Sequence, residues 1–296
     1  MVGITFLGTA DSIPSRDRNH TSILLNFNEE NILIDCGEGT QRQFRKAKLN
    51  PCKITRILIT HWHGDHVLGI PGLLSTLSLS GYSKTLNVYG PRGTEEKFWK
   101  SLEVFPFRRE YKIIFNEISS GIFFENENFY LSAEEMEHGI PSLAYSFIEK
   151  GHIRIKPEKV KELGSGRHLK DLKEGKDVVI NGKKIKSKNC IYKEEDKQVS
   201  IVLDTKLNSK IIPFVKNANI LIGEATFSSE LKKEAEEHMH LTVSQIAEIA
   251  KKAKANKLII THISSRYLKN LKSFLGEAKK IFPKSYLAKD LDFFSL

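Results

Sequence analysis

Short strand-like segments alternate with helix-like segments in both halves of this 296-residue chain, and this order constrains the fold more than any other feature. Apolar runs bounded by turn residues predict strands at residues 3–9, 22–27, 31–37, 54–60, 85–90, 111–118, 122–132, 142–149, 199–205, 218–226, 257–264 and 285–296. Apolar residues at helical spacing predict helices at 40–47, 67–80, 94–102, 209–218, 242–255 and 267–282. The interleaving predicts an α/β fold of two packed sheets with helices outside, a four-layer αββα sandwich. Thr242 and Gln245 form the pattern of a capping box at the start of helix 242–255.

A basic segment at about 151–190 interrupts this order. It holds twelve Lys and Arg against five Asp and Glu, a net +7 within a chain of net +10. The segment is poor in aromatic residues and rich in glycine, so we expect a projecting basic arm inserted into a single domain of residues 1–296. A flexible, solvated insertion is the alternative. The excess charge makes nucleic acid the first partner to consider.

The number of cysteines and the hydropathy of the chain indicate in which cellular compartment the protein is expected. Cys36, Cys52 and Cys190 are too few and too scattered for a disulfide framework, which favours a cytoplasmic protein. The chain begins with neither the basic region nor the apolar run of a signal peptide. No stretch approaches the roughly 18 apolar residues of a membrane span, so no membrane association is expected.

Three histidines and an aspartate fall within six residues directly after a predicted strand: His61, His63, Asp65 and His66. Imidazole and carboxylate groups suit Zn²⁺. A closed structural zinc site is the alternative, but such sites usually include thiolates, and no cysteine lies near the run. Ligands this close on a short loop diverge more easily onto two ions than they converge on one. The run therefore predicts a metal pair that supports hydrolysis.

A second ion needs further ligands, and His138, Asp204 and His262 are the candidates. Each lies at or near the end of a predicted strand, where ligands gather in α/β folds. A lone histidine is more often a surface or core residue than a ligand. That interpretation suits four other histidines: His20, His152, His168 and His238.

Several further strings, taken with this run, resemble the ribonuclease Z family of the metallo-β-lactamase superfamily. They are Phe6–Thr9, Pro14–Asn19, Asp35–Gln41, His138–Tyr145, Gly223–Phe227, His240–Thr242 and Thr261–Tyr267. The strings occur in the family's order and cover nearly the whole chain. The chain departs from the family pattern at Gly223, Leu241, Leu203 and, in the arm, at 164–168, none of which is a proposed ligand.

The resemblance implies two Zn²⁺ per subunit, with Mn²⁺ as the alternative ion and no small organic cofactor. The implied ligands are His61, His63 and His138 on one ion, Asp65, His66 and His262 on the other, and Asp204 as a bridge. It also implies three catalytic groups. Asp65 orients the attacking water or accepts its proton, while Glu224 and His240 supply the proton for the leaving oxygen. Support of the zinc ligands is the alternative role of that pair. His240 lies near a helix amino terminus, which we expect to favour its neutral form.

The resemblance further implies that the protein binds precursor tRNA. Around the site, the expected RNA contacts are Arg16, Asn19, Ser264 and Arg266. On the arm they are Lys159, Lys161, Arg167, Lys170 and Lys173. In the family the arm grips the tRNA that is bound at the partner subunit's site, which implies a homodimer.

The sequence thus predicts a zinc-dependent endoribonuclease that removes the 3′ trailer of precursor tRNA, with water activated by two metals. The alternative is another superfamily hydrolase acting on a small phosphodiester or (thio)ester, which would have no use for a basic arm. A di-iron redox protein usually needs more carboxylates. An RNA-binding protein without activity requires lost ligands, and none is missing.

Overall fold

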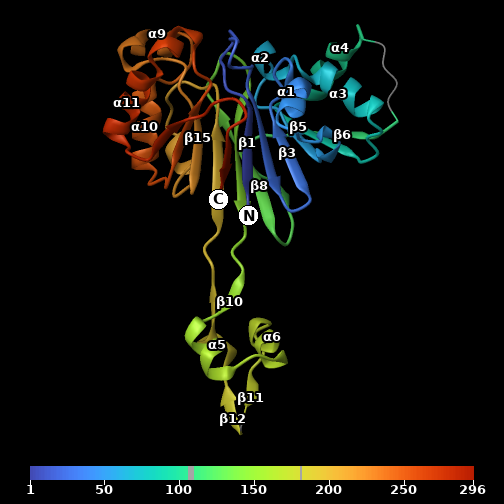
Figure 1. The fold of residues 1–296 in the computed structure, drawn as a ribbon, viewed down its shortest axis with the longest axis vertical. Helices are drawn as coiled ribbons and strands as arrows, with labels where there is room; N and C mark the ends of the chain where they lie inside the picture. The colour runs from blue at the N-terminus through green and yellow to red at the C-terminus, as the bar shows by residue number, and fades with distance from the viewer. Residues whose placement is uncertain (106–109, 181) are drawn as a thin grey trace. The chain divides into compact units, whose positions relative to one another are not determined.

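A computed structural model describes residues 1–105, 110–180 and 182–296 (Figure 1). Its contacts divide the chain into two compact units. The larger unit comprises Met1–Glu125, Leu131–Phe147 and Gln198–Leu296, and the smaller unit comprises Asn126–Tyr130 and Ile148–Lys197. None of the helices in the described ranges combines the length and the hydrophobicity that a membrane span requires.

Two seven-stranded sheets form the larger unit. The first has the order β18 (Phe293–Ser295), β1 (Gly3–Gly8), β2 (Ser22–Phe27), β3 (Glu30–Ile34), β4 (Arg56–Leu58), β5 (Leu86–Gly90) and β6 (Ile113–Glu117). The second has the order β17 (Ser285–Leu287), β16 (Leu258–Thr261), β15 (Ile220–Glu224), β14 (Lys197–Val202), β9 (Ser142–Glu149), β8 (Phe129–Met136) and β7 (Gly121–Glu125).

Each sheet contains a run of four parallel strands. These are β3 to β6 in the first sheet and β14 to β17 in the second. Parallel strands place their carboxyl ends at one edge of a sheet, which is where ligands bind in α/β folds. The segments that follow β4, β14 and β16 begin at such edges, and they carry all the predicted metal ligands except His138, which follows β8.

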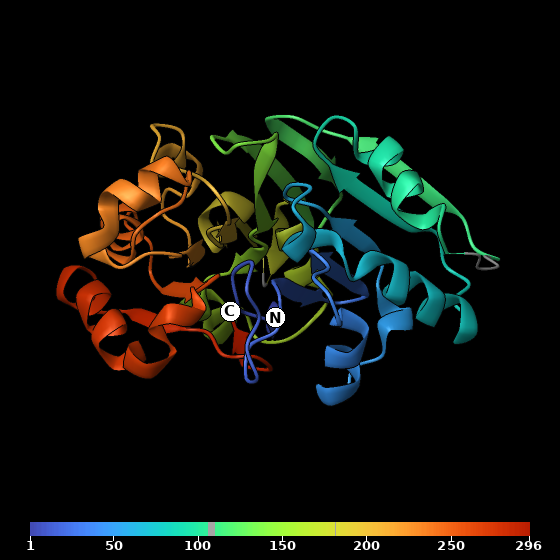
Figure 2. The same cartoon turned by 90° about the horizontal axis from the view of Figure 1, so that it is seen from above.

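Helices cover the outer face of each sheet (Figure 2). On the first sheet α1 (Thr40–Lys46), α3 (Ile70–Leu79) and α4 (Thr94–Leu102) bury Phe44, Leu73 and Phe98 in one apolar cluster with strand residues. On the second sheet α10 (Val243–Lys252) and α11 (Leu271–Ile281) bury Ile246 and Phe274 in another. The remaining helices of this unit are short: α2 (Gly64–Val67), α8 (Ile211–Phe214), α9 (Lys232–Glu237) and the 3₁₀ segments Pro51–Lys53, Ser229–Leu231 and Ser265–Asn270.

The inner faces of the sheets meet across buried aromatic residues. Tyr145 on β9 donates its hydroxyl to the carbonyl of Ile59, 2.7 Å away, beyond the end of β4. The rings of Phe27 and Phe147 lie 5.3 Å apart, centroid to centroid. Complete burial of each such side chain contributes ~1.5–3 kcal/mol. The four-layer αββα arrangement is therefore confirmed.

The capping box of α10 is also confirmed. Thr242 Oγ1 accepts a hydrogen bond from the backbone N–H of Gln245 (3.3 Å), and Gln245 Oε1 accepts one from the N–H of Thr242 (2.8 Å). These bonds fix the start of the helix two residues beyond His240.

Several predicted elements differ from the structure, and the helix expected at 267–282 is divided into the 3₁₀ segment Ser265–Asn270 and α11. Residues 285–296 form two strands in different sheets, because the chain turns at Leu291 (φ 69°). Residues 122–132 divide into β7 and β8 at a turn where Asn126 N–H donates to Phe129 O (3.0 Å). The strand expected at 111–118 is shorter, Ile113–Glu117, and joins the first sheet as β6, parallel to β5. Of the helix expected at 209–218 only α8 forms, since Pro213 donates no hydrogen bond.

The predicted basic insertion lies within the smaller unit, which has secondary structure of its own. Strand β10 (Ile153–Ile155) pairs with β13 (Ile191–Lys193), and β11 (Val178–Ile180) pairs with β12 (Lys183–Ile185). The helices are α5 (Pro157–Leu163), α6 (Arg167–Lys173) and α7 (Ser187–Cys190). Ile155, Leu172 and Cys190 form a small buried core. Asn181, within the predicted arm, lies outside the described residues.

Candidate metal centre

The run from His61 to His66 joins the end of a strand to the start of a helix. After β4 the chain continues through Ile59 and Thr60 to His61, and α2 begins at Gly64. Asp65 and His66 lie in the first turn of that helix and are buried. A strand end followed at once by a helical turn directs the side chains of this run toward one region.

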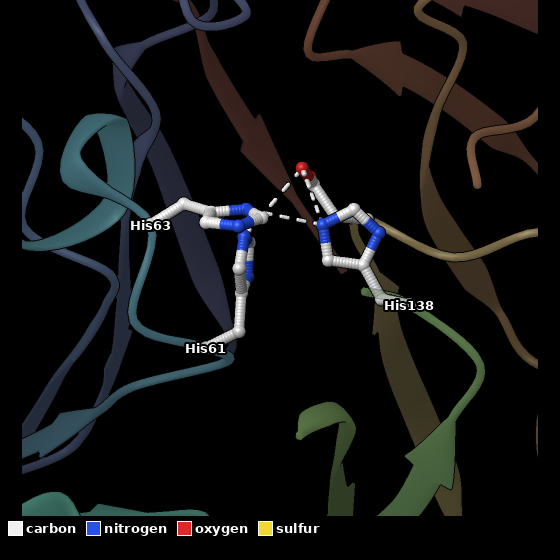
Figure 3. Close-up of side chains that lie close together, drawn as sticks. His61, His63 and His138 are labelled. Carbon is white, nitrogen blue, oxygen red and sulfur yellow. Dashed lines mark hydrogen bonds and ion pairs between the residues drawn. The ribbon is translucent and has the colours of Figure 1, made fainter. Parts of the chain in front are cut away.

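The other candidate ligands come from the second sheet. His138, Asp204 and His262 follow β8, β14 and β16. The ligand atoms form two groups, in each of which they lie within 4.8 Å of one another: His61, His63, His138 and Asp204; and Asp65, His66, Asp204 and His262. Figure 3 shows the rings of His61, His63 and His138 turned toward one another. The structure thus brings together all seven predicted ligands, with Asp204 in both groups.

The two carboxylate oxygens of Asp204 face different histidines. Oδ2 lies 3.6 Å from Nε2 of His61 and 3.9 Å from Nε2 of His138. Oδ1 lies 3.4 Å from Nε2 of His66 and 3.2 Å from Nε2 of His262. One carboxylate therefore stands between two separate sets of nitrogen atoms, as a bridging ligand does.

Hydrogen bonds on the outer side of the rings of His61 and His66 fix their tautomers. Thr60 Oγ1 donates to Asp35 Oδ2 (2.7 Å), so it accepts from Nδ1–H of His61 (3.0 Å). Asp35 Oδ2 also accepts from Nδ1–H of His66 (2.6 Å). The proton of each neutral ring lies on Nδ1, which leaves a lone pair on Nε2 for a metal.

Hydrogen bonds also place the ring proton of His138 and His262 on Nδ1. The carbonyl of Met239 accepts from Nδ1–H of His138 (3.1 Å). Thr226 Oγ1 donates to Glu224 Oε2 (2.7 Å) and accordingly accepts from Nδ1–H of His262 (2.9 Å). All these rings present Nε2 to Asp204.

The donor atoms fit divalent cations. Nε2 of His66 lies 3.3 Å from Nε2 of His262, and Nε2 of His138 lies 3.1 Å from Nδ1 of His63, so ring nitrogens of separate histidines face one another at close range. Nε2 of His61 and Oδ1 of Asp204 are buried and accept no hydrogen bond in the described part of the chain. Buried acceptors that converge without donors are costly unless a cation lies between them. The set of nitrogen and oxygen donors suits zinc and related ions.

The carboxylates of the cluster are held in their charged form. Burial alone would raise the pKa of Asp204, but His262, His66 and His61 outweigh it and lower that pKa. Burial likewise raises the pKa of Asp65, whereas the neighbouring imidazoles of His262 and His66 outweigh it and lower that pKa well below its usual range. Burial and the neighbouring His66 lower the pKa of His61, which favours the neutral form that a ligand needs.

Buried Glu224 and partly buried His240 form a pair next to the cluster. Nδ1 of His240 lies 3.0 Å from Oε1 of Glu224, which also accepts from the N–H of Thr205 (3.0 Å). Burial lowers the pKa of His240, but the charge of Glu224 outweighs it and raises the pKa to about 9. The expectation of a neutral His240 was therefore wrong, because a carboxylate in direct contact has more effect than the end of a helix.

Sequence reasoning missed the residues that orient the ligands, namely Asp35, Thr60 and Thr226. Asp35 and His262 adopt left-handed backbone conformations (φ 56° and 55°), which are uncommon outside glycine and cluster at functional sites. The position of Asp35 at the end of β3 was a signal that could have pointed to it. At Gly223 the chain departs from the family pattern. A Cβ atom at this position would lie only 2.5 Å from the side chain of Ile246, so that side chain occupies the space a larger residue would need.

Of the RNA contacts predicted around the site, only Arg16 and Arg266 are exposed. The side chain of Asn19 donates a hydrogen bond to the carbonyl of Glu38 (2.6 Å), so it connects its own loop to the segment that contains Glu38. Ser264 is buried, and its Oγ accepts from Nε of Arg266 (3.3 Å), whose guanidinium lies over the ring of Phe227.

The residues predicted on the arm lie on α5 and α6 of the smaller unit. Lys161, Arg167, Lys170 and Lys173 are exposed. Lys159 pairs with Glu162, and Lys170 lies 3.9 Å from Glu174. These surface pairs are worth little to stability and leave the cations accessible to a polyanion.

Two facing sheets with helices outside, and a histidine–aspartate cluster at the strand ends, define a metal-dependent hydrolase of the metallo-β-lactamase fold. The solved structure of the metallo-β-lactamase fold protein YhfI from Bacillus subtilis has this fold (TM-score 0.71, 19% identity, 99% of this chain and 98% of that one). Human tRNase Z, short form, superimposes with a TM-score of 0.73 at 27% identity (99% of this chain and 98% of that one).

A ribonuclease Z of Listeria welshimeri is 42% identical over 302 residues, 99% of each chain. The chain therefore belongs to the ribonuclease Z family. It also belongs to the family described as Anti-Pycsar protein Apyc1, whose model matches residues 2–279.

Proposed function

We propose that this protein is an endoribonuclease that removes the 3′ trailer of precursor tRNA. The observation that carries the proposal is the convergence of six side chains, from three strand ends, around the two oxygens of Asp204. The ribonuclease Z relatives and the similarity to human tRNase Z support tRNA as the substrate. The basic segment at 151–190 supports a polyanionic substrate.

The proposed cofactor is a pair of Zn²⁺ ions in each subunit, with Mn²⁺ as the alternative ion. One ion would be held by His61, His63 and His138, the other by Asp65, His66 and His262, and both by Asp204. When bound, two such cations supply Lewis acidity that makes water a nucleophile at neutral pH and neutralises phosphate charge.

Three side chains would handle water and protons. Asp65, charged because of its lowered pKa, can orient the attacking water and accept the proton that the water loses. The water oxygen bonds to phosphorus, the bond to the 3′ oxygen breaks, and the trailer keeps the phosphate. His240, protonated beside Glu224, can give a proton to the leaving 3′ oxygen.

The other parts of the proposal concern how the tRNA is held. The cations of α5 and α6, with Arg16 and Arg266, would contact phosphates and so position the RNA without reading its sequence.

We propose that residues 1–296 form one metallo-β-lactamase-like domain with the arm inserted, that the protein is a homodimer, and that it acts in the cytoplasm. The homodimer would let the arm of one subunit hold a tRNA at the site of the other.

The decisive experiment is cleavage of one precursor tRNA transcript by the protein and by His63→Ala. We expect loss of cleavage with tRNA binding largely kept, since His63 contributes a ring nitrogen to the cluster. His238→Ala is the matched control, because His238 is exposed and outside the cluster, and should cleave normally. Turnover of bis(p-nitrophenyl) phosphate by an enzyme that leaves the precursor intact would instead favour a small-substrate hydrolase.

The metal requires a separate measurement. Metal analysis of the purified protein should find two zinc ions per chain. Two iron ions and no zinc would contradict the proposed cofactor.

A further inference from the structure

One small cavity adjoins the metal cluster at His240, and a second cavity lies next to it. One, of about 180 Å³, is lined by His240 together with Lys206, Leu207, Lys232 and Gln245. The other, of about 210 Å³, shares Leu207, Lys232 and Gln245 with the first, so the two are neighbours, and it extends to Ile212 and Ile249. Sites that bury a whole small molecule measure about 300–1,000 Å³, so each cavity is of a size for one part of a nucleotide.

Leu207 stands at the junction of the cavities and is 50% exposed. It lies three residues after Asp204 on a loop that is firmly held. Asn208 Nδ2 donates to Thr205 Oγ1 and to the carbonyl of Lys206, each at 3.1 Å, and the N–H of Lys206 donates to Glu137 O at 2.8 Å. The chain therefore keeps a large apolar side chain at the surface beside its metal cluster.

The charges around Leu207 suit a phosphate-bearing ligand. Lys206, Lys232 and Lys252 line the cavities, against Glu236 and Glu248. Lys206 is partly engaged, because its Nζ lies 3.0 Å from Glu137 Oε2. Lys232 makes no such pair among the described residues. An apolar surface with a free lysine beside it matches a nucleotide, which combines a flat base with a charged phosphate.

The proposed function indicates which nucleotide of the precursor these cavities would bind. If His240 gives its proton to the 3′ oxygen that leaves, the ribose that carries this oxygen lies against His240. The base of the same nucleotide then reaches the cavities that continue from His240. We propose that they form a subsite for the last nucleotide that the tRNA keeps, with its base against Leu207 and a neighbouring phosphate near Lys232. This inference rests on the proposed function.

The test is a coupling measurement between Leu207→Ala and the base. The kcat/KM of the full-length enzyme is measured on three precursors: an intact one, one abasic at the last retained nucleotide, and one abasic at the first trailer nucleotide. Leu207→Ala should lower kcat/KM about tenfold on the intact and trailer-abasic precursors. On the precursor that is abasic at the retained nucleotide it should have little further effect, because the base it would contact is gone.

Leu79→Ala is the matched control. Leu79 is 90% exposed at the end of α3 and lies outside both cavities, so this variant should behave as the unchanged enzyme on all three precursors. An equal loss from Leu207→Ala on the intact and retained-abasic precursors would overturn the subsite. So would coupling to the trailer base, or a loss explained by dissociation of a dimer in size-exclusion chromatography.

A second pair of variants tests the phosphate contact. The slope of the logarithm of precursor affinity against the logarithm of salt concentration measures the number of phosphate contacts. Lys232→Ala should make this slope shallower by about one, whereas Lys233→Ala, one residue along the same helix, should leave it unchanged. Equal slopes in the two variants would overturn this contact. If the unchanged enzyme does not cleave the intact precursor, the proposed function fails. If it cleaves without coupling, only the subsite fails.

Discussion

At the residue scale, the cluster depends on side chains that are not themselves proposed metal ligands. Thr226 is the clearest case, since one hydroxyl accepts from Nδ1–H of His262 (2.9 Å) and donates to Glu224 (2.7 Å). It also lies 3.3 Å from Nδ1 of His240. A single oxygen therefore orients a proposed metal ligand and both members of the proposed proton donor.

Exchanging Thr226 for valine should lower zinc affinity. Thr226→Val keeps the shape but removes the acceptor for His262, and loss of such a partner typically costs 10–100-fold in metal affinity. Thr226→Ser keeps the hydroxyl and should stay close to the unchanged protein. Competition with a chromophoric zinc chelator measures the affinities. Equal affinities for the valine and serine variants would show that the hydroxyl has no such role.

The sequence was informative about the ligands and silent about their partners. His61, His63, Asp65 and His66 are neighbours in the chain, and His138, Asp204 and His262 follow predicted strands, so the sequence alone indicated all seven. Asp35 and Thr226 act through distances that no local pattern encodes. The charge of His240 was mispredicted for the same reason, because Glu224 is 16 residues away in sequence but 3.0 Å away in space.

At the scale of elements, patterns confined to one segment were predictable. The capping box of α10 depends on four consecutive positions and was found from sequence alone. Pairing between distant segments was not. Residues 285–296 continue one apolar pattern, yet β17 pairs with β16 and β18 with β1, and only the packing of the two sheets decides this.

The folding of the smaller unit can be tested through its cysteine. Cys190 is buried with Leu172, and Cys36 is buried in the larger unit, where burial raises its pKa to about 12. Cys52 is partly exposed. We therefore expect one fast-reacting thiol in the native protein at pH 8, and none in Cys52→Ser. Rapid reaction of a second thiol would mean that the core around Cys190 opens readily.

Excision of the arm tests its part in catalysis. Ile155 and Ile191 are partners in the β10–β13 pair, so an Asn-Gly turn can replace residues 156–190 without separating them. Cleavage of precursor tRNA should fall by at least about tenfold, since phosphate contacts would be lost. Hydrolysis of bis(p-nitrophenyl) phosphate should persist. Equal loss on both substrates would indicate damage to the metal centre and count against a role in tRNA binding.

At the scale of the whole molecule, positive charge and the proposed metal ligands lie in different parts of the chain. Seven of the ten net positive charges lie in residues 151–190, while the seven proposed ligands lie in the larger unit. We therefore propose that long-range attraction to RNA and hydrolytic chemistry are carried by different parts of the chain. Such a division makes binding and cleavage separable by mutation.

Salt dependence measures this division directly. Each phosphate contact releases counterions, so the logarithm of the affinity falls linearly with the logarithm of salt concentration, by about 0.7–0.9 per contact. Excising 156–190 removes eleven Lys and Arg and five Asp and Glu, which lowers the net charge from +10 to +4. Measured with His63→Ala to prevent cleavage, the excised protein should bind precursor tRNA with a slope shallower by several contacts. An unchanged slope would mean that the larger unit alone holds the tRNA, and that the charge of the smaller unit serves another purpose.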